Sequence, residues 1–276
     1  MSTPVHALLD RLQRAAGRSS ALVRLAILVR NQARCVIKYH LAEGPDVAET
    51  GEVWLRKALA SDAQFVVDVG ANVGDWMAGM YEAQAGSAFD ALLFEPSSSA
   101  AARLRERFAG NQHIRVVEAA VGDAPGELPF FEEPNAGKGS SLVPQFNRNP
   151  GTMRGVEVTT LDAELARAGW ERIDLLKIDA EGYDLRVLRG ARGLLEAQRI
   201  RVLQFEYNRA WQAAGDTLSA AYSLLQSHGY QVYLLKRDGL YTLNYRLYEE
   251  YFEYSNFVAI APDQMGMLSG QMRGMI

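Results

Sequence analysis

The sequence holds a single cysteine, Cys35, among its 276 residues. One cysteine excludes an internal disulfide, and a nucleophilic thiol would need a base beside it that the neighbouring residues do not supply. Free cysteines are among the residues most often found in protein interiors. We therefore expect Cys35 to be an ordinary buried thiol and the protein to be cytoplasmic.

Long apolar runs are also lacking. The best candidate, residues 21–29, is interrupted by Arg24 and has about half the length that a membrane-spanning helix requires. The N-terminus has no apolar stretch followed by a small-residue cleavage site, which argues against export. The net charge is -4, so no overall basic field favours a nucleic acid partner.

Histidine is scarce as well. The four histidines, His6, His40, His113 and His228, do not have the spacing of metal ligands. No serine lies in a G-x-S-x-G turn, so the sequence gives no sign of a Ser-His-Asp triad. These absences argue against a histidine metal centre and against a serine hydrolase.

The first part of the chain is strongly basic. Residues 1–62 have helical patterns, and we expect them to form an N-terminal helical cap. Between Met1 and His40, one acid, Asp10, faces seven basic residues, which gives a local charge of +6. This basic face either packs on the catalytic domain with its charges in water, or contacts a partner. The partners left open are an acidic acceptor, an anionic membrane surface and a second copy of the chain. The seven basic residues are Arg11, Arg14, Arg18, Arg24, Arg30, Arg34 and Lys38.

Residues 63–262 alternate between strand and helix patterns, which indicates an α/β domain whose mostly parallel sheet carries helices on both faces. The helical patterns cover 97–108, 184–197 and 218–227. The apolar runs that predict strands are 65–69, 91–94, 114–117, 173–178, 200–205, 229–236 and 257–261.

Two segments lack a periodic pattern. Residues 132–155 are rich in proline and glycine, and an ordered domain seldom keeps an irregular loop longer than about 15 residues unless it has a function. We interpret 132–155 as a lid over the active site. Residues 263–276 are rich in methionine and glycine, and we expect a flexible tail there.

The strongest motif is FVVDVGANVGDW, residues 65–76, in which a buried strand leads through a glycine-rich turn into a helix. Glycines at such a turn let the backbone approach a ligand, and at the carboxyl end of a first parallel strand that ligand is normally a nucleotide or nucleoside. From Gly70 the dinucleotide fingerprint fails, because Asn72 and Asp75 replace two of its three glycines. The phosphate-binding loop motif also fails in GKGSSL. The turn therefore suits an adenosine that carries no phosphate.

Glu95 ends the next apolar run, in ALLFEP. A carboxylate at the tip of that strand can accept hydrogen bonds from both hydroxyls of a ribose. Glu95 thus supports an adenosine ligand, although nicotinamide enzymes use the same device.

The motifs occur in an order that resembles the FkbM-type methyltransferase family. They are VVDVGANVGDW, LLFEPSSSAAARLRERF, IRVVEAAVGDAPGELPFF, GKGSSL, VTTLDAEL, IDLLKIDAEGYDLRVLRGA and LQFEYN, from about Phe65 to Asn208. The resemblance implies a class I methyltransferase, with a Rossmann-like sheet of seven strands of which the last is antiparallel. It also implies that S-adenosylmethionine is the cofactor, and that a sugar, polyketide or similar metabolite receives a methyl group on oxygen.

The resemblance assigns cofactor contacts residue by residue. It places Asp68, Gly70, Ala71, Asn72 and Gly74 around the methionine part of S-adenosylmethionine, and Glu95 at the ribose. Ala120 and Val121 would border the adenine. Many class I enzymes carry an acid where this chain has Ala120, which favours backbone contacts to the adenine here.

Acids at two further strand tips are the candidates for catalysis. Asp179 and Glu181 follow one strand, and Glu206 and Asn208 follow its neighbour. Either Asp179 or Glu181 takes the hydroxyl proton directly, or Asp179, Glu206 and Asn208 hold Mg²⁺ that acidifies the hydroxyl. Two structural alternatives stay open: Glu181 as a helix cap and Asp179 as a ligand of the cofactor's amino group.

The sequence therefore predicts an S-adenosylmethionine-dependent O-methyltransferase that acts on a small-molecule or glycan acceptor. The alternatives are an inactive cofactor-binding scaffold and a nicotinamide-dependent dehydrogenase.

Overall fold

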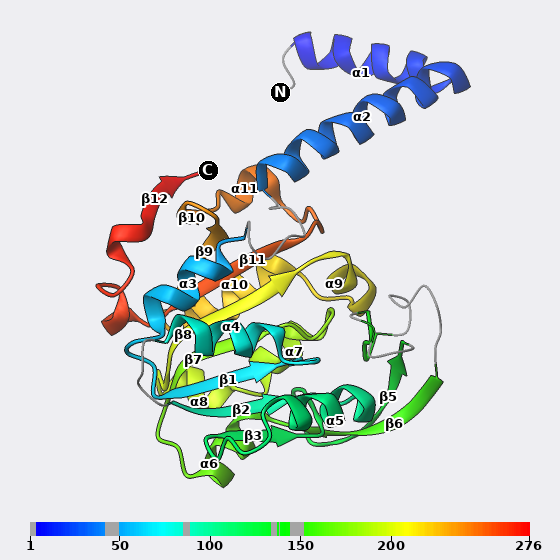
Figure 1. Ribbon diagram of the computed structural model, residues 1–276. Helices are drawn as coiled ribbons and strands as arrows, with labels where there is room; N and C mark the ends of the chain where they lie inside the picture. The colour runs from blue at the N-terminus through cyan, green and yellow to red at the C-terminus, as the bar shows by residue number, and fades with distance from the viewer. Residues whose placement is uncertain (1–3, 42–49, 85–88, 134–136, 138, 144–151) are drawn as a thin grey trace. The chain divides into compact units, whose positions relative to one another are not determined.

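The computed structural model describes residues 4–41, 50–84, 89–133, 137, 139–143 and 152–276. The chain divides into two compact units, Met1–Ala42 and Glu43–Ile276 (Figure 1). The second unit contains both sheets and, with them, all the strand-tip residues singled out above.

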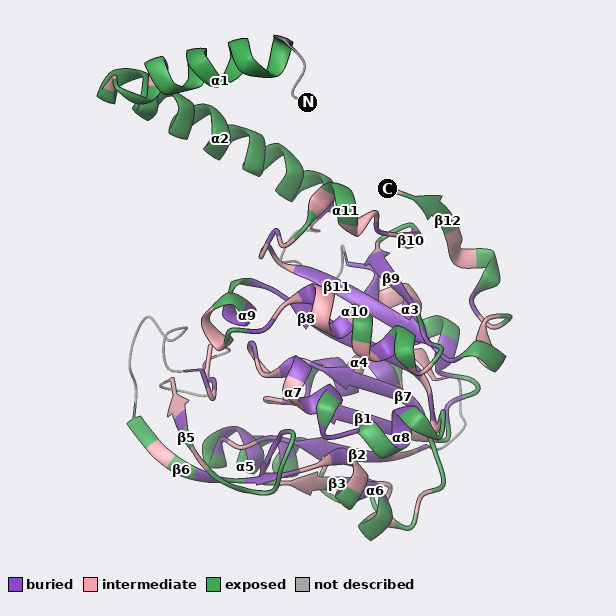
Figure 2. Cartoon of the chain, turned by 180° about the vertical axis from the view of Figure 1, so that it is seen from behind, coloured by how far each residue is buried: buried purple, intermediate pink, exposed green. Residues whose placement is uncertain are grey.

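The first unit consists of helices α1 (Pro4–Gly17) and α2 (Ser20–Leu41). Most of the described residues of both helices are exposed (Figure 2). The expectation of a buried thiol was wrong, because Cys35 lies on the exposed surface of α2. Helix α3 (Glu52–Leu59), which we had grouped with the cap, belongs to the second unit and places Leu55 and Leu59 in its core.

The main sheet has nine strands in the order β12-β10-β9-β11-β8-β7-β1-β2-β3. All seven strands predicted from apolar runs are among them. Their bounds are β1 Phe65–Val69, β2 Asp90–Phe94, β3 Ile114–Val117, β7 Ile173–Ile178, β8 Ile200–Tyr207, β9 Gln231–Lys236 and β11 Ser255–Ile260. Strand β11 runs antiparallel to both β8 and β9, whereas β3, β2, β1, β7 and β8 are parallel.

The expected number of seven strands was wrong, because two short strands extend the sheet beyond β9. Strand β10 (Gly239–Thr242) forms a hairpin with β9, and β12 (Met272–Met275) pairs with β10. The end of the chain is therefore not a free tail. Nε of Arg273 donates to the carbonyl oxygen of Asp238 at 2.7 Å, and Met267 and Met272 pack against the core.

Helices cover both faces of the main sheet (Figure 1). On one face, α3 and α4 (Asp75–Ala83) bury Leu55 and Met77 against strand residues such as Leu175. On the other face, rings of α9 (Arg209–Ala214) and α10 (Leu218–Ser227) pack near Phe257. The remaining helices of this unit are α5 (Ser98–Arg107), α6 (Leu161–Ala168), α7 (Asp184–Arg189), α8 (Arg192–Glu196) and α11 (Tyr245–Tyr248).

A second, three-stranded sheet was not predicted. It has the order β4-β6-β5, with bounds Ala120–Val121, Thr152–Thr159 and Gly126–Glu132. The ends of the expected lid, Glu132 and 152–155, belong to these strands. Residues 144–151 lie outside the described part of the chain, so the lid stays a prediction.

The predicted helix 184–197 is interrupted after α7, at Gly190. A Cβ atom at this position would lie 1.9 Å from the carbonyl oxygen of Gly122, which follows β4. The carbonyl of Gly190 also accepts a hydrogen bond from the backbone N–H of Asp162 at 3.1 Å. The break between α7 and α8 therefore joins the small sheet to the helical layer.

We predict that Gly190→Ala destabilises the protein by about 1–3 kcal/mol, because the added methyl group must displace backbone atoms. Urea denaturation measures the change in the free energy of unfolding. Gly126→Ala is the matched control, since a Cβ atom there has no neighbour within 4 Å. Equal stability of the two variants would contradict the contact between Gly190 and Gly122.

Candidate functional site

The turn after β1 lies against the tips of both neighbouring strands. The backbone N–H groups of Gly70 and Ala71 both donate to the carbonyl oxygen of Phe94, at the end of β2, at 3.0 Å. A Cβ atom at Gly70, which has a φ of +79°, would lie 1.9 Å from the carbonyl oxygen of Asp179, after β7. Only glycine fits this position, which explains the first glycine of the motif.

Glu95 lies directly beside this turn. Its Oε2 accepts from the backbone N–H of Asn72 at 2.8 Å, and its Oε1 accepts from the N–H of Ser97 at 2.7 Å. The side chain is buried, and burial raises the pKa of the carboxyl to about 7 despite the lowering effect of these two hydrogen bonds. Each carboxylate oxygen has a further lone pair, so Glu95 can accept hydrogen bonds from a ligand as well.

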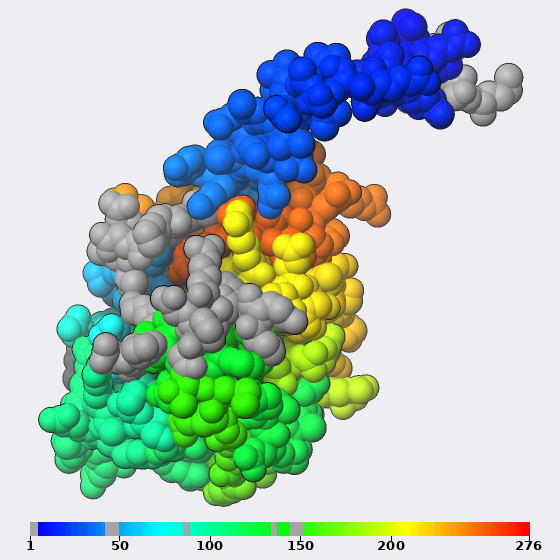
Figure 3. Space-filling model, turned by 90° about the vertical axis from the view of Figure 1, so that its right-hand side faces the viewer, coloured from blue at the N-terminus to red at the C-terminus, as the bar shows by residue number. Residues whose placement is uncertain are grey.

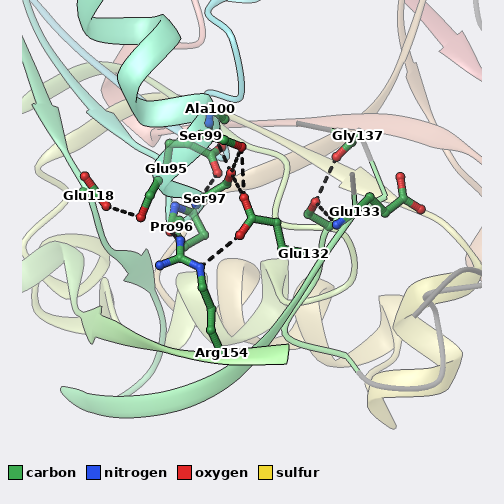
Figure 4. Close-up of polar contacts among 12 residues, drawn as sticks. Glu95, Pro96, Ser97, Ser99, Ala100, Glu118, Glu132, Glu133, Gly137 and Arg154 are labelled. Atoms are coloured by element: carbon green, nitrogen blue, oxygen red, sulfur yellow. Dashed lines mark hydrogen bonds and ion pairs between the residues drawn. The ribbon is translucent and has the colours of Figure 1, made fainter. Parts of the chain in front are cut away.

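The small sheet supports the segment that follows Glu95 (Figure 4). The hydroxyls of Ser97 and Ser99 both donate to Glu132 of β5, and Nε of Arg154 in β6 donates to the same carboxylate at 3.0 Å. Arg154 also donates to the carbonyl oxygen of Pro96. Glu132 and Arg154 could not be linked to Glu95 from the sequence, because the contacts join residues that are far apart in the chain.

A buried ion cluster underlies the turn. Asp68 of β1 is fully buried, and Nζ of Lys177 in β7 lies 3.5 Å from its Oδ1 and 3.2 Å from Oδ2 of Asp179. Burial raises the pKa of Asp68, and Lys177 opposes this shift. Burial disfavours the charge on Lys177, but Asp179 and Asp68 raise its pKa above the usual value. Asp68 therefore forms a buried ion pair with Lys177 just before the turn, a contact that the local sequence around Lys177 does not indicate.

Four acids gather at the tips of β7 and β8: Asp179, Glu181, Asp184 and Glu206. Burial and the charge of Asp179 raise the pKa of Glu181 and Glu206 well above the ordinary value, and that of Asp184 to about 7. Asp184 is 1% exposed, and its Oδ2 accepts from the backbone N–H of Gly182 at 3.2 Å. The side chain of Asp179 is 33% exposed, whereas Asp184 and Glu206 are buried.

Asn208 does not join this cluster as a metal ligand. Its Oδ1 accepts from the backbone N–H of Ala210 at 2.7 Å and caps α9, while its Nδ2 donates to Glu206. Among the residues that the structure describes, no three His, Cys, Asp or Glu side chains are placed to hold a metal ion. The predicted Mg²⁺ site of Asp179, Glu206 and Asn208 is therefore unsupported, because Asn208 is used within the fold.

Three further residues that were predicted to contact the cofactor, Gly74, Ala120 and Val121, lie in the turn before α4 and in β4. Gly74 has a φ of +84° and precedes α4, and its position would bring a Cβ atom within 2.7 Å of Leu104 and Phe108. Ala120 and Val121 are buried in β4, where they pair with β6 rather than with the main sheet. Their expected contact with the adenine stays a prediction.

Comparisons with known proteins agree with one family. A family model described as methyltransferase FkbM domain matches residues 68–232. Methyltransferase sdnD of Sordaria araneosa is 30% identical over 156 residues, which cover 46% of this chain and 60% of that protein. The 2-O-methyltransferase NoeI of Sinorhizobium fredii is 30% identical over 131 residues, or 42% of this chain and 53% of that protein. The chain thus spans little more than half the length of these relatives.

Solved structures with a similar arrangement include a methyltransferase FkbM from Methylobacillus flagellatus, at 18% identity and a TM-score of 0.48. That match covers 72% of this chain and 44% of the other. Fibrillarin from Aeropyrum pernix, solved with bound S-adenosyl-L-methionine, matches at 10% identity and a TM-score of 0.42, covering 76% of this chain and 73% of the other.

The raised pKa values predict how stability depends on pH. Because the pKa of Asp184 is about 7 in the folded state and its ordinary value is 3.8, the folded state retains a proton that the unfolded state releases between these values. Stability is therefore lost as pH rises through about 7. We expect Asp184→Asn to remove part of this loss, and to gain on the order of 1–3 kcal/mol relative to the wild type at about pH 8.

Urea denaturation at about pH 5 and at about pH 8 measures this difference. Exposed Glu196 on α8 provides the control Glu196→Gln, which should keep the wild-type dependence on pH. A wild-type protein that becomes more stable as pH rises across this range would contradict the retention of a proton by buried Asp184 in the folded state.

Proposed function

The chain belongs to the FkbM methyltransferase family, and from this membership and the geometry of the site we propose that it is an S-adenosylmethionine-dependent O-methyltransferase. The proposed acceptor is a hydroxyl group of a sugar, a polyketide or a similar metabolite. The name of the 2-O-methyltransferase NoeI supports oxygen as the methylated atom. The family match favours this reaction over a nicotinamide-dependent dehydrogenase.

The observation that carries the proposal is the contact between Glu95 and the turn at Asn72. A buried carboxylate joins the tips of β1 and β2, next to backbone that only glycine at position 70 allows. This arrangement fits a nucleoside, because the carboxylate accepts from ribose hydroxyls while the open turn admits the rest of the ligand. Asp68, Ala71 and Gly74 complete the proposed pocket, with Ala120 and Val121 toward the adenine.

When bound, S-adenosylmethionine supplies a methyl group on a sulfonium, which is already reactive toward oxygen. The protein then has to align the acceptor hydroxyl and accept its proton as the bond from oxygen to the methyl carbon forms and the sulfur–carbon bond breaks. Asp179 suits this role, because its backbone borders the turn at Gly70 and its side chain is partly accessible. Glu181, two residues further along, is the alternative base.

The direct test is methyl transfer from labelled S-adenosylmethionine to a panel of sugar and polyketide acceptors. The proposal expects label on an acceptor oxygen and release of S-adenosylhomocysteine. Tight binding of S-adenosylhomocysteine with no transfer to any acceptor would favour an inactive scaffold. Saturable binding of NADH, with none of S-adenosylhomocysteine, would favour a dehydrogenase.

We predict that Glu95→Ala weakens the binding of S-adenosylhomocysteine by about 1–3 kcal/mol, because charge-assisted hydrogen bonds to the ribose are lost. Titration calorimetry measures the dissociation constant. The pKa of about 7 adds a pH dependence: affinity of the wild type should fall as pH drops through about 7, since the carboxylate takes up a proton. Glu106→Ala on the exposed side of α5 is the control, and unchanged affinity in Glu95→Ala would remove Glu95 from the site.

We predict that Asp179→Asn lowers kcat by about 10²–10⁴-fold with little change in the KM of the acceptor, because the amide cannot take the proton. Steady-state kinetics of the purified variant measure both constants. Exposed Asp263 provides the control Asp263→Asn. If Glu181→Gln shows this loss of kcat and Asp179→Asn does not, Glu181 is the base.

A further inference from the structure

Helix α1 has an exposed apolar face. Val5, Leu8, Leu9 and Leu12 follow the spacing i, i+3, i+4, i+7, which places them on one side of the helix. Their exposed fractions are 64%, 59%, 49% and 58%. Helices of globular proteins bury such a face against a partner, so an exposed one indicates that a partner surface exists.

Helix α2 repeats the arrangement over a longer stretch. Leu22, Leu25, Val29 and Val36 share one side of the helix and are 48%, 57%, 59% and 70% exposed. By the same helical spacing, the basic residues Arg24, Arg34 and Lys38 lie on the opposite side, which also carries the exposed side chains of Val23 and Ile27. In Figure 3 these helices are the blue part of the molecule, and Figure 2 shows them as almost wholly exposed.

The boundary between the basic and the acidic part of the chain lies close to the boundary between the two units. The first 40 residues carry +6, and the whole chain carries -4, so the remainder carries -4 - 6 = -10. The partner of α1 and α2 must therefore tolerate both a high density of cations and a continuous row of apolar side chains.

The described part of the second unit exposes few large apolar side chains. Among the described residues after Ala42, the only exposed large hydrophobic residues are Met153, Leu247 and Met275. A second copy could not pair its α1 and α2 with those of the first without bringing two charges of +6 together. An anionic lipid surface meets both requirements, because its headgroups attract cations and the acyl boundary below them accepts apolar side chains.

We propose that α1 and α2 bind an anionic membrane surface and lie in the plane of its headgroups. In the described part of the chain, neither these helices nor any other combine the length and apolar character needed to cross a bilayer. The apolar residues of both helices enter the boundary between headgroups and acyl chains. The arginines and Lys38 reach lipid phosphates, and each basic residue near such a surface strengthens the attraction.

The test is flotation of the full chain with vesicles. We expect the wild type to float with vesicles of equal parts phosphatidylcholine and phosphatidylglycerol, and to stay in solution with vesicles of phosphatidylcholine alone. Added salt should weaken the binding, because it screens the attraction between the cations and the headgroups. These measurements use the unaltered protein, so they decide the proposal even where a variant does not fold.

Two double variants separately test the apolar and the electrostatic contributions to membrane binding. Leu8→Gln with Leu12→Gln removes apolar side chains, and Arg11→Glu with Arg18→Glu reverses charge; each should weaken partitioning by about tenfold or more. The matched controls are Leu247→Gln and Arg192→Glu, at exposed positions of the second unit, and both should bind as the wild type does. Circular dichroism and binding of S-adenosylhomocysteine show that each variant is folded.

Three results would overturn the proposal. One is equal binding of the wild type to neutral and anionic vesicles, and another is absence of binding to both. The third is a dimer in gel filtration that the leucine variants dissociate, in a protein that does not bind vesicles, which would assign α1 and α2 to contact between copies.

Discussion

The carboxylate of Glu95 bridges two backbone N–H groups, one from the turn after β1 and one from the start of the segment after β2. Both bonds form in a buried site, where an unpaired carboxylate would be costly. The ends of two adjacent strands are thereby fixed relative to each other. Around this contact the small sheet adds the contacts of Glu132 and Arg154, so the position of Glu95 depends on three separate parts of the chain.

The acids near the tips of β7 and β8 lie close together in a largely buried site, where negative charges repel one another. Burial raises the pKa values of Glu181, Asp184 and Glu206, and the charge of Asp179 raises them further. Lys177 is the cation that offsets part of this repulsion, between Asp179 and Asp68. A site with proton-holding acids beside an accessible carboxylate is suited to remove a proton from an acceptor hydroxyl. The proposed nucleoside pocket and the acid cluster meet at Gly70, where a Cβ atom would lie 1.9 Å from the carbonyl oxygen of Asp179.

Strands with a full apolar run could be predicted from the sequence, as could the glycine-rich turn at Gly70–Gly74. Strands β5 and β6 could not, because exposed residues interrupt their apolar positions. These residues are Glu127 and Pro129 in β5, and Gly155 and Glu157 in β6. Short β10 and β12 carry too few apolar residues to show a period. The roles of Lys177 and Arg154 depend on contacts between residues far apart in the sequence. Asn208 was considered only as a metal ligand, although its place directly before α9 is the local signal of the helix cap that it forms.

The central claim is that Glu95 and the adjacent turn hold the nucleoside of the cofactor. A crystal structure of the protein with S-adenosylhomocysteine tests it most directly. We expect the ribose hydroxyls within hydrogen-bond distance of the Glu95 carboxylate, and the sulfur beside the strand tips that carry Asp179. A nucleoside bound away from Glu95, or a ribose with no contact to this carboxylate, would contradict the account.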